Sequence, residues 1–392
     1  MRLHGRATFA KQAGFSLLCG MRLLIVHPEA RFFAGAEKML GHFLTGLLAA
    51  DHQVTVAVAP GSRTAGVVPA GCAVVPVPEN GRFSLITLGR TLAILRRAHV
   101  RTPFAVVHGW GARDWELAGL AGRLLGRPAL GTLHDHPLAS FITGSRRRLM
   151  RLAARRGLQR VVCVSEAVRR ACADAGYPVE RLAVVRNGLP PVPPLQRSWR
   201  TEGRLRLGFL GAFSERKGLR GFFAALAMFA ARTNQPWELH LAGEAQDAGG
   251  HKMLADLHRQ HAAEPWWPQV HWHGWMDTPA RLLGMVDVLV VPSSEFDPFP
   301  TVLLEAGQAG VPVLAARVGG VAEIIVPGET GWLFEPGDWS GAAAKLEWLA
   351  GQSATEFARR GKLTFQRQAT DFTLEKMSAQ YGEIFSRLTT DG

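Results

Sequence analysis

Short apolar runs rich in β-branched residues alternate with amphipathic stretches along the whole chain. This alternation predicts parallel sheets whose strands are joined by helices. Expected strands in the first half lie at residues 23–27, 53–59, 105–108, 129–133, 160–164 and 182–186. Those in the second half lie at 205–210, 237–242, 270–272, 286–291 and 312–315. Ligands bind such sheets at the carboxyl ends of the strands, so the residues that follow each strand are the candidate site residues.

A proline-rich segment between the two sets of strands marks a domain boundary. Residues 188–195 carry four prolines, which can continue neither a helix nor a central strand. The length of 392 residues also suits two domains. We expect one Rossmann-like domain over 21–195, a second over 196–372 and a last helix over 373–392. Residues 1–20 are expected to be a disordered extension, because their apolar run is too short for the core of a signal peptide.

Charge and cysteine content narrow the class of protein. The formal net charge of +13 suits phosphate-bearing ligands, an anionic membrane surface or nucleic acid. No basic–aromatic motif for nucleic acid is present, so no nucleic-acid partner is expected. The four cysteines form no CxxC pair and no cluster with metal spacing, which argues against a structural zinc site or a disulfide framework. No run of about 18 apolar residues is present, so no bilayer-spanning segment is expected.

The strongest chemical signal is an acidic loop and helix that follow the expected strand 286–291. Pro298 and Pro300 mark the start of a helix. Asp297 precedes this helix and Glu305 lies about two turns inside it, which separates their Cα atoms by roughly 12 Å. The carboxyl groups of a hydrolase acid–base pair lie only about 5–9.5 Å apart. The spacing therefore favours two anchors for one long ligand, with an ordinary loop and helix as the alternative.

A glycine turn and a basic pair follow the expected strand 205–210. Gly211 begins the turn, and Arg216 and Lys217 lie where the next helix is expected to start. Cations at this position would stabilise negative charge on a bound ligand. A solvent-exposed arginine–lysine pair is the alternative.

Together the two segments resemble the donor site of retaining GT-B glycosyltransferases of the large group 1 family, glycosyltransferase family 4. The acidic segment is similar to the family's Glu-x7-Glu signature, which implies that Asp297 holds hydroxyls of the donor sugar and Glu305 the ribose. The basic segment is similar to the family's Gly-Arg-x4-Lys-Gly element, which implies that Lys217 neutralises the diphosphate. This chain has aspartate at 297 where glutamate is usual, Ala212 in place of the arginine, and Pro300 where glycine is common. These departures leave the identity of the donor open.

The resemblance covers about residues 21–388. It implies an α/β fold of the GT-B type, with two facing Rossmann-like domains and a C-terminal helix that crosses back to the first. It also implies a set of donor-binding residues at strand ends and on the acidic helix. They are Gly35, Gly211, Arg216, Lys217, Gly243, Trp275, Asp297, Phe299, Thr301, Val302, Glu305 and Gly320.

Three histidines near strand ends of the first half are candidates for acceptor binding. His134 matches a family histidine that points into the cleft near the transferred sugar, and His108 and His136 join it as candidates. Buried structural histidines are the alternative. No third ligand accompanies His134 and His136 at metal spacing, and no Asp-x-Asp motif occurs, so no metal is expected. The resemblance implies His134, Lys217 and Asp297 as catalytic residues.

An arginine-rich helix is expected between residues 145 and 160. Four arginines fall within an arc of about 100° on its surface. They are Arg147, Arg148, Arg151 and Arg155. Leu149, Leu152 and Ala153 fall on the opposite side, where we expect them to pack on the sheet. The cationic face suits anionic lipid headgroups or a lipid-diphosphate acceptor, and a solvated helix is the alternative.

The sequence thus predicts a retaining hexosyltransferase that uses a nucleotide diphosphate-sugar, without metal or other cofactor. The acceptor is expected to be a glycan or lipid-linked, in cell-envelope or exopolysaccharide synthesis. The expected location is the cytoplasm, including the inner face of the membrane. The alternative is a catalytically silent GT-B protein that serves as a regulatory or assembly partner. The departures at Asp297 and Ala212 would favour it, as would Ala34, which replaces the first glycine of the Gly-Gly-Ala-Glu loop that residues 34–37 resemble.

Overall fold

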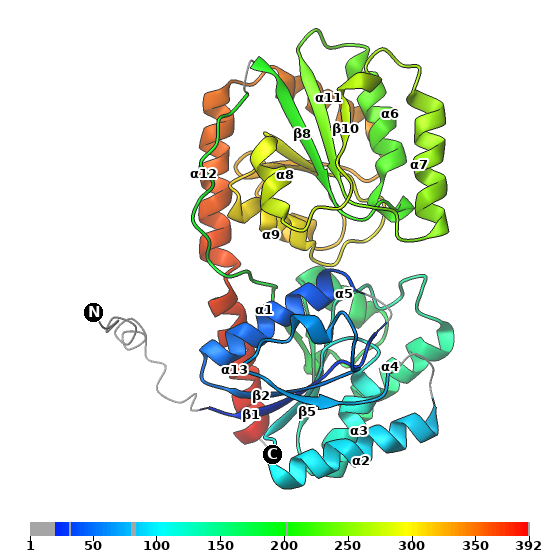
Figure 1. Ribbon diagram of the computed structural model, residues 1–392, viewed down its shortest axis with the longest axis vertical. Helices are drawn as coiled ribbons and strands as arrows, with labels where there is room; N and C mark the ends of the chain where they lie inside the picture. The colour runs from blue at the N-terminus through cyan, green and yellow to red at the C-terminus, as the bar shows by residue number, and fades with distance from the viewer. Residues whose placement is uncertain (1–19, 31–32, 80–83, 201–202, 391–392) are drawn as a thin grey trace, which may run out of the picture.

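Two α/β domains stand one above the other along the long axis of the computed structural model (Figure 1). The structure describes residues 20–30, 33–79, 84–200 and 203–390. The predicted disordered extension lies, except for Gly20, outside the described residues. In the described part of the chain no helix is both long and apolar enough to cross a bilayer.

The first domain is built on a seven-stranded parallel sheet with the strand order β3-β2-β1-β4-β5-β6-β7. Leu24 in the centre of β1 pairs with Thr55 on one side and Val107 on the other. Residues 23–26 are at most 1% exposed, because helices cover both faces of the sheet. The strands are β1 (Arg22–Val26), β2 (Gln53–Val58), β3 (Ala73–Pro76), β4 (Val106–Gly109), β5 (Ala129–Leu133), β6 (Arg160–Cys163) and β7 (Leu182–Val184). The helices are α1 (Gly35–Ala49), α2 (Leu85–Arg101), α3 (Trp115–Leu125), α4 (Gly144–Arg156) and α5 (Glu166–Asp174).

The second domain repeats this plan with a six-stranded parallel sheet in the order β10-β9-β8-β11-β12-β13. Helices α6 and α11 pack together, whereas α8 and α9 adjoin each other and α9 contacts α12. The strands are β8 (Leu205–Leu210), β9 (Trp237–Ala242), β10 (Val270–Trp272), β11 (Val288–Val291), β12 (Val313–Ala316) and β13 (Gly331–Phe334). The helices are α6 (Leu219–Ala230), α7 (Ala248–His261), α8 (Pro279–Met285), α9 (Thr301–Gln308), α10 (Val321–Ile324) and α11 (Trp339–Ala350).

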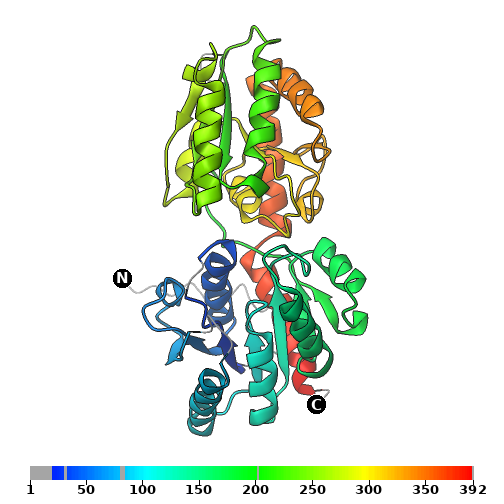
Figure 2. The ribbon, with the colours of Figure 1, turned by 90° about the vertical axis from the view of Figure 1, so that its right-hand side faces the viewer.

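The last two helices join the domains. Helix α12 (Ala354–Asp371) runs along the second domain, and α13 (Leu374–Thr390) continues onto the first domain beside α1 (Figures 1 and 2). Where the chain crosses, Leu189 N donates to Phe372 O over 3.0 Å and Leu374 N donates to Leu189 O over 2.9 Å. The hydroxyl groups of Tyr381 on α13 and Thr132 on β5 lie 2.9 Å apart in the core. The predicted fold, including the helix that crosses back, is confirmed.

Most predicted strands coincide with observed ones, with differences at the edges. Strand β3 was not predicted, because this edge strand is largely exposed and shows no buried apolar run. Strand β13 was not predicted either. The strand expected at 286–291 is shorter in the structure, where β11 begins at Val288.

Candidate active site

The N-termini of two helices face each other across the boundary between the domains. Helix α1 begins at Gly35 in the first domain, and α9 begins at Thr301 in the second. A Cβ atom built on Gly35 would lie 3.4 Å from Thr301 Oγ1. The first N–H groups of a helix lack intrahelical partners and carry the positive end of its dipole. Two such ends directed at one space favour an anionic ligand such as a diphosphate.

The side chains of Lys217 and Asp297 meet beside these helix ends. Lys217 Nζ donates to Asp297 Oδ2 over 2.7 Å, and Ser293 Oγ donates to the same oxygen over 3.2 Å. Their loops are also in backbone contact, because Ser294 N donates to Arg216 O over 3.0 Å. The two residues, which stand 80 positions apart in the chain, are thus brought into one site.

Glycine allows two of the loops in this site to touch. Gly218, with a φ of 73°, follows Lys217, and a Cβ atom there would overlap the carbonyl oxygen of Pro292. Gly319, with a φ of 51°, lies against Asp297, and a Cβ atom there would overlap the carbonyl oxygen of Asp297. Gly320 N donates to that same carbonyl oxygen over 2.9 Å. The glycine pair after β12 therefore fixes the backbone that carries Asp297.

Lys38 connects the two sides of the site. It lies on α1 of the first domain, with its Nζ 5.3 Å from the ring centroid of Trp275 in the second domain. Burial raises the pKa of Glu305 on α9, and the charge of Lys38 opposes this shift. Trp275 is 44% exposed, and its Nε1 donates to Asp277 Oδ1 over 2.8 Å. Sequence reasoning placed Trp275 and Glu305 in the site but missed Lys38, which lies one turn after Gly35.

A buried charged cluster supports the first-domain side of the site. His27 Nδ1 lies 2.7 Å from Asp114 Oδ2, and His27 Nε2 lies 3.4 Å from Glu37 Oε1. Burial alone would lower the pKa of His27, but the two carboxylates outweigh it and raise this pKa to about 10. The imidazole is therefore a cation at neutral pH. Glu37 also accepts from Ala34 N over 2.6 Å and so caps α1 at the position where it faces α9.

His134 follows β5 beside this cluster. Its ring lies 4.6 Å from that of Trp110, centroid to centroid. Burial lowers the pKa of His134 to about 4, so the imidazole is neutral, and its buried Nε2 has no hydrogen-bond partner among the described residues. A neutral imidazole nitrogen of this kind can accept or donate one hydrogen bond to a bound sugar hydroxyl.

Asp135, next in the chain, is a site residue that sequence reasoning missed. Burial raises the pKa of its carboxyl group, an effect that Arg216 opposes and that Glu37 and Asp297 reinforce. The groups that influence this pKa come from both domains: Glu37 belongs to the first, and Arg216 and Asp297 belong to the second. His136 follows it, with its ring 4.6 Å from that of Phe296 in the second domain.

Two predicted site residues have their side chains in the core. His108 is 1% exposed, its Nε2 lies 2.8 Å from Thr132 Oγ1, and burial lowers its pKa to about 3. Phe299 is 4% exposed, with its ring 5.7 Å from that of Phe372. Two further predicted residues, Gly211 and Gly243, lie in turns that touch each other, since a Cβ atom on Gly243 would overlap Gly211 O. Val302 is half-buried on α9.

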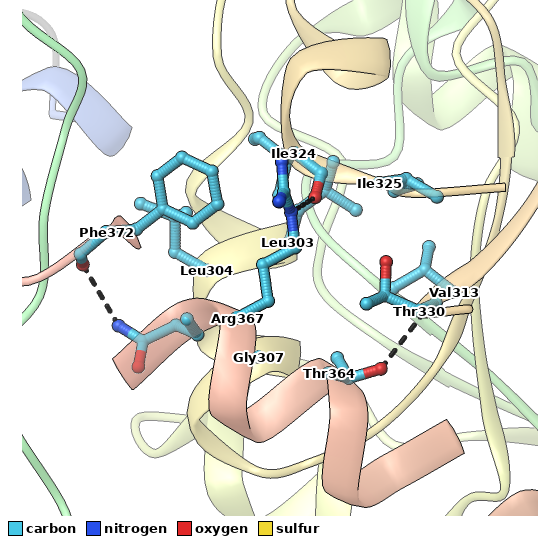
Figure 3. A pocket seen from close by; sticks show the side chains of 11 residues that line it. Leu303, Leu304, Gly307, Val313, Ile324, Ile325, Thr330, Thr364, Arg367 and Phe372 are labelled. Atoms are coloured by element: carbon cyan, nitrogen blue, oxygen red, sulfur yellow. Dashed lines mark hydrogen bonds between the residues drawn. The ribbon is translucent and has the colours of Figure 1, made fainter. Parts of the chain in front are cut away.

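Helix α9 is supported from behind by α12. Figure 3 shows Leu303 and Leu304 of α9 lining a small apolar pocket opposite Thr364 and Arg367 of α12. Thr364 Oγ1 donates to Thr330 O over 3.1 Å, and Arg367 Nε donates to Ile324 O over 2.7 Å. The pocket lies on the side of α9 that packs against α12, so it is not part of the candidate site. The contacts with α12 hold α9 in place.

Glu323 links the domains at the edge of the site. Its carboxylate accepts from Glu166 N over 3.1 Å and from Ala167 N over 2.9 Å, at the N-terminus of α5 in the first domain. It also pairs with Arg186 over 2.8 Å. A carboxylate at a helix N-terminus interacts favourably with the helix dipole. This contact therefore favours the arrangement in which the two domains face each other.

The arginine-rich helix differs from its prediction in how its arginines are used. Arg147 donates to the carbonyl oxygens of Leu138 and Ala139 over 3.0 Å, and Arg155 donates to Gly176 O over 3.1 Å. Arg148 is exposed and Arg151 is half-buried. Leu152 was expected to pack on the sheet but is 49% exposed, because Met150, Ala153 and Ala154 form the buried side of α4.

Two facing Rossmann-like domains with a charged site between them define a GT-B glycosyltransferase fold. The solved Anabaena protein HepE, in complex with UDP and glucose, matches with a TM-score of 0.78 at 20% identity, over 93% of this chain and 99% of that one. The lipopolysaccharide outer core galactosyltransferase WaaB, solved in its apo form, matches with a TM-score of 0.72 at 17% identity, over 94% of this chain and 100% of that one.

Sequence comparisons identify the family. Residues 33–191 match the model of Glycosyltransferase Family 4, and residues 195–362 match that of Glycosyl transferases group 1. The chain therefore belongs to the group 1 glycosyltransferases of family 4. The lipopolysaccharide core biosynthesis glycosyltransferase LpsE of Rhizobium meliloti is 25% identical over 361 residues, which cover 88% of this chain and 96% of LpsE. The glycogen synthase of Mycobacterium tuberculosis is 29% identical over 214 residues, which cover 54% of this chain and only about half, 49%, of that relative.

Proposed function

We propose that this protein is a retaining glycosyltransferase that moves a hexose from a nucleotide diphosphate-sugar to an acceptor hydroxyl. The observation that carries the proposal is the meeting of Lys217, Asp297 and the N-termini of α1 and α9 in one site. The relatives support it, because HepE was solved with UDP and glucose and LpsE is named as a lipopolysaccharide core glycosyltransferase. We also propose a role in envelope or exopolysaccharide synthesis, which the name of LpsE supports.

In the proposed reaction, the acceptor oxygen bonds to the anomeric carbon on the face from which the diphosphate departs. The bond from that carbon to the β-phosphate oxygen breaks, and the acceptor proton passes to the departing phosphate. Lys217, Arg216 and the N–H groups of α1 and α9 stabilise the charge that develops on the diphosphate. Asp297 binds hydroxyls of the donor sugar, Glu305 binds the ribose, and Trp275 lines the base.

His134 and His136 are assigned to the acceptor side. His134 is neutral and has a buried nitrogen without a partner among the described residues, which suits a hydrogen bond to a sugar hydroxyl.

The transfer step is proposed to need no metal, since Lys217 and the helix ends supply the positive charge. Turnover of EDTA-treated protein should therefore stay the same when Mg²⁺ or Mn²⁺ is added.

Thermal shift against UDP-, GDP-, ADP- and CMP-sugars tests the proposal first, because a bound donor stabilises the fold by RT ln(1 + [L]/Kd) and so raises the unfolding temperature. The sugar that stabilises the protein is then supplied with candidate glycan and lipid-linked acceptors, and the anomeric configuration of the product is read by NMR. An inverted product would contradict retention.

The departures at Asp297, Ala212 and Ala34 leave a catalytically silent protein as second candidate, which would bind a donor without hydrolysing or transferring it.

We also propose that the first domain docks on an anionic membrane surface. Leu138, Phe141 and Leu152 are 47%, 62% and 49% exposed beside the cationic residue Arg148. Exposed apolar side chains next to arginines suit the interface of an anionic bilayer. In liposome flotation, a variant with Phe141→Ser and Arg148→Ser should bind less than the wild-type protein. Arg259→Ser, on the exposed surface of α7, is the control. Equal flotation of all three proteins would reject membrane docking.

A further inference from the structure

Four side chains of types that can bind metal ions lie on one face of the second sheet, at its edge. Glu238 and His240 belong to β9, whereas His271 and His273 belong to or follow β10, the edge strand. His240 is the register partner of His271. Since side chains two positions apart point to the same face of a strand, the four side chains share that face.

Three of these residues bring ligand atoms together. His240 Nε2 lies 3.2 Å from Glu238 Oε1, and His271 Nε2 lies 3.9 Å from Glu238 Oε2. The ligand atoms of Glu238, His240 and His271 all lie within 4.8 Å of one another. Bonds of about 2.0–2.2 Å to a tetrahedral zinc ion would place such atoms roughly 3.4 Å apart. Small side-chain rotations would therefore close the group around an ion.

The fourth residue explains why His240 presents a lone pair to this group. His240 Nδ1 lies 2.9 Å from His273 Nε2, so Nδ1–H can donate to His273. This tautomer leaves His240 Nε2 with a lone pair. Histidines that bind metals typically donate their other ring N–H to such a partner, which fixes the tautomer and the ring orientation.

The surroundings of His240 Nε2 suit a bound cation. His240 is 8% exposed, and its buried Nε2 has no geometrically defined hydrogen bond among the described residues, although Glu238 Oε1 lies 3.2 Å away. An ion bound between this nitrogen and the carboxylate oxygen, which lie 3.2 Å apart, would satisfy both atoms.

We propose that Glu238, His240 and His271 bind a divalent metal ion of the zinc class, with His273 as the positioning residue for His240. Two imidazole nitrogens and one carboxylate oxygen suit Zn²⁺ and leave a fourth position for water. His271, with 43% of its side chain exposed, gives the ion access from solvent. Arg204, whose NH1 lies 3.8 Å from Glu238 Oε2, adds a positive charge that weakens binding.

The site would fasten β10 to β9 close to the base-binding side of the donor site. His273 is followed by Gly274, whose carbonyl oxygen accepts from Gly243 N over 2.8 Å, and then by Trp275. The metal thereby stabilises the turn that carries Trp275. Neither Lys217 nor Asp297 of the proposed donor site takes part.

The experiment uses the full chain without a histidine tag, stripped with EDTA and titrated with Zn²⁺ by calorimetry. Co²⁺ serves as a spectroscopic probe, because its visible absorption reports imidazole ligation and coordination number. The wild-type protein should bind one ion and unfold at a higher temperature with it. His271→Ala and Glu238→Gln should bind at least 100-fold more weakly, whereas His273→Ala should lose about 10–100-fold, as expected for a residue that orients a ligand.

The matched control is His251→Ala, which removes an exposed histidine from α7 of the same domain. It should bind zinc like the wild-type protein. Circular dichroism checks that each variant is folded. The proposal is overturned if the wild-type protein binds no stoichiometric ion, or if His271→Ala and His251→Ala bind equally well.

Discussion

The ammonium group of Lys217 and the carboxylate of Asp297 lie 2.7 Å apart, although the two residues follow different strands of the second sheet. Each side chain is largely buried, with 17% and 7% of its surface exposed. In the absence of donor, each charge is thus balanced by the other. A donor that binds here would replace this contact with one from Lys217 to the diphosphate and one from Asp297 to the sugar.

Lys217→Ala should lower turnover by roughly 10²–10³, the usual effect of losing one group that stabilises developing negative charge. The measurement is product formation at saturating donor and acceptor. Lys345→Ala, which removes an exposed lysine from α11, should leave turnover unchanged. Near-normal turnover of the Lys217 variant would mean that the diphosphate binds elsewhere.

Glu323→Ala should favour separation of the two domains. The variant loses two backbone hydrogen bonds to the N-terminus of α5 and the ion pair with Arg186, which all cross the domain boundary. Hydrogen bonds to a charged group contribute about 1.5–3 kcal/mol each, so the open form should gain at least about tenfold in population. Small-angle X-ray scattering should show a larger radius of gyration without donor.

The control for this change is Glu335→Ala, which breaks the pair between Arg317 and Glu335 within the second domain. It should leave the scattering curve unchanged. If both variants scatter like the wild-type protein, Glu323 does not govern the arrangement of the domains.

His27→Gln should destabilise the first domain by about 3–5 kcal/mol, because it leaves the buried carboxylates of Asp114 and Glu37 without their cation. The pKa of His27 is raised from 6.5 to about 10 in the folded protein. The native state therefore binds a proton that the unfolded chain releases above pH 6.5. The resulting stabilisation is complete below pH 6.5 and is lost as the pH rises towards 10.

Urea denaturation at several pH values measures this effect. The stability difference between wild type and His27→Gln should be largest at pH 6.5 and should shrink towards pH 10. A difference that is independent of pH would show that His27 is not the titrating group.

Gly307→Ala should destabilise the second domain by about 1–3 kcal/mol through overpacking. A Cβ atom on Gly307 would lie 2.6 Å from Gln368 Cβ and 2.7 Å from Gln368 Cγ, where α12 presses on α9. The same substitution at Gly284 of α8 meets no atom within 4 Å and should stabilise the helix slightly, since alanine favours helices. Thermal unfolding of both variants checks the opposite signs, and a stabilised Gly307→Ala would mean that α12 yields easily.

Strands and motifs that show a local pattern in the sequence could be predicted. The strand β1 appears as a continuous apolar run because helices cover both its faces, and the edge strand β3 has no such run because solvent reaches it. Lys217 and Asp297 could both be assigned to the donor site from the sequence, because each lies in a recognisable motif that follows a strand of the second sheet. The contact between them confirms only that they are neighbours, and their roles towards a donor stay predictions.

Features that depend on two distant segments were not predictable. Lys38 and Asp135 enter the site only because the domains face each other, and no local pattern indicates that. His108 resembles a site residue by its position near a strand end, but strand alternation turns its side chain towards Thr132 and α13. The group of Glu238, His240 and His271 depends on the register of β9 with β10, which the spacing of residues along the chain does not reveal.

Helix α13 contributes Tyr381 and Phe385 to the interior of the first domain, against Thr132 and His108. The first domain therefore lacks part of its core until residues 374–390 have left the ribosome, after the entire second domain has been synthesised. We expect the nascent first domain to remain incomplete and open to chaperones through most of translation. The second domain, whose strands and α12 are contiguous, can complete its own core before then.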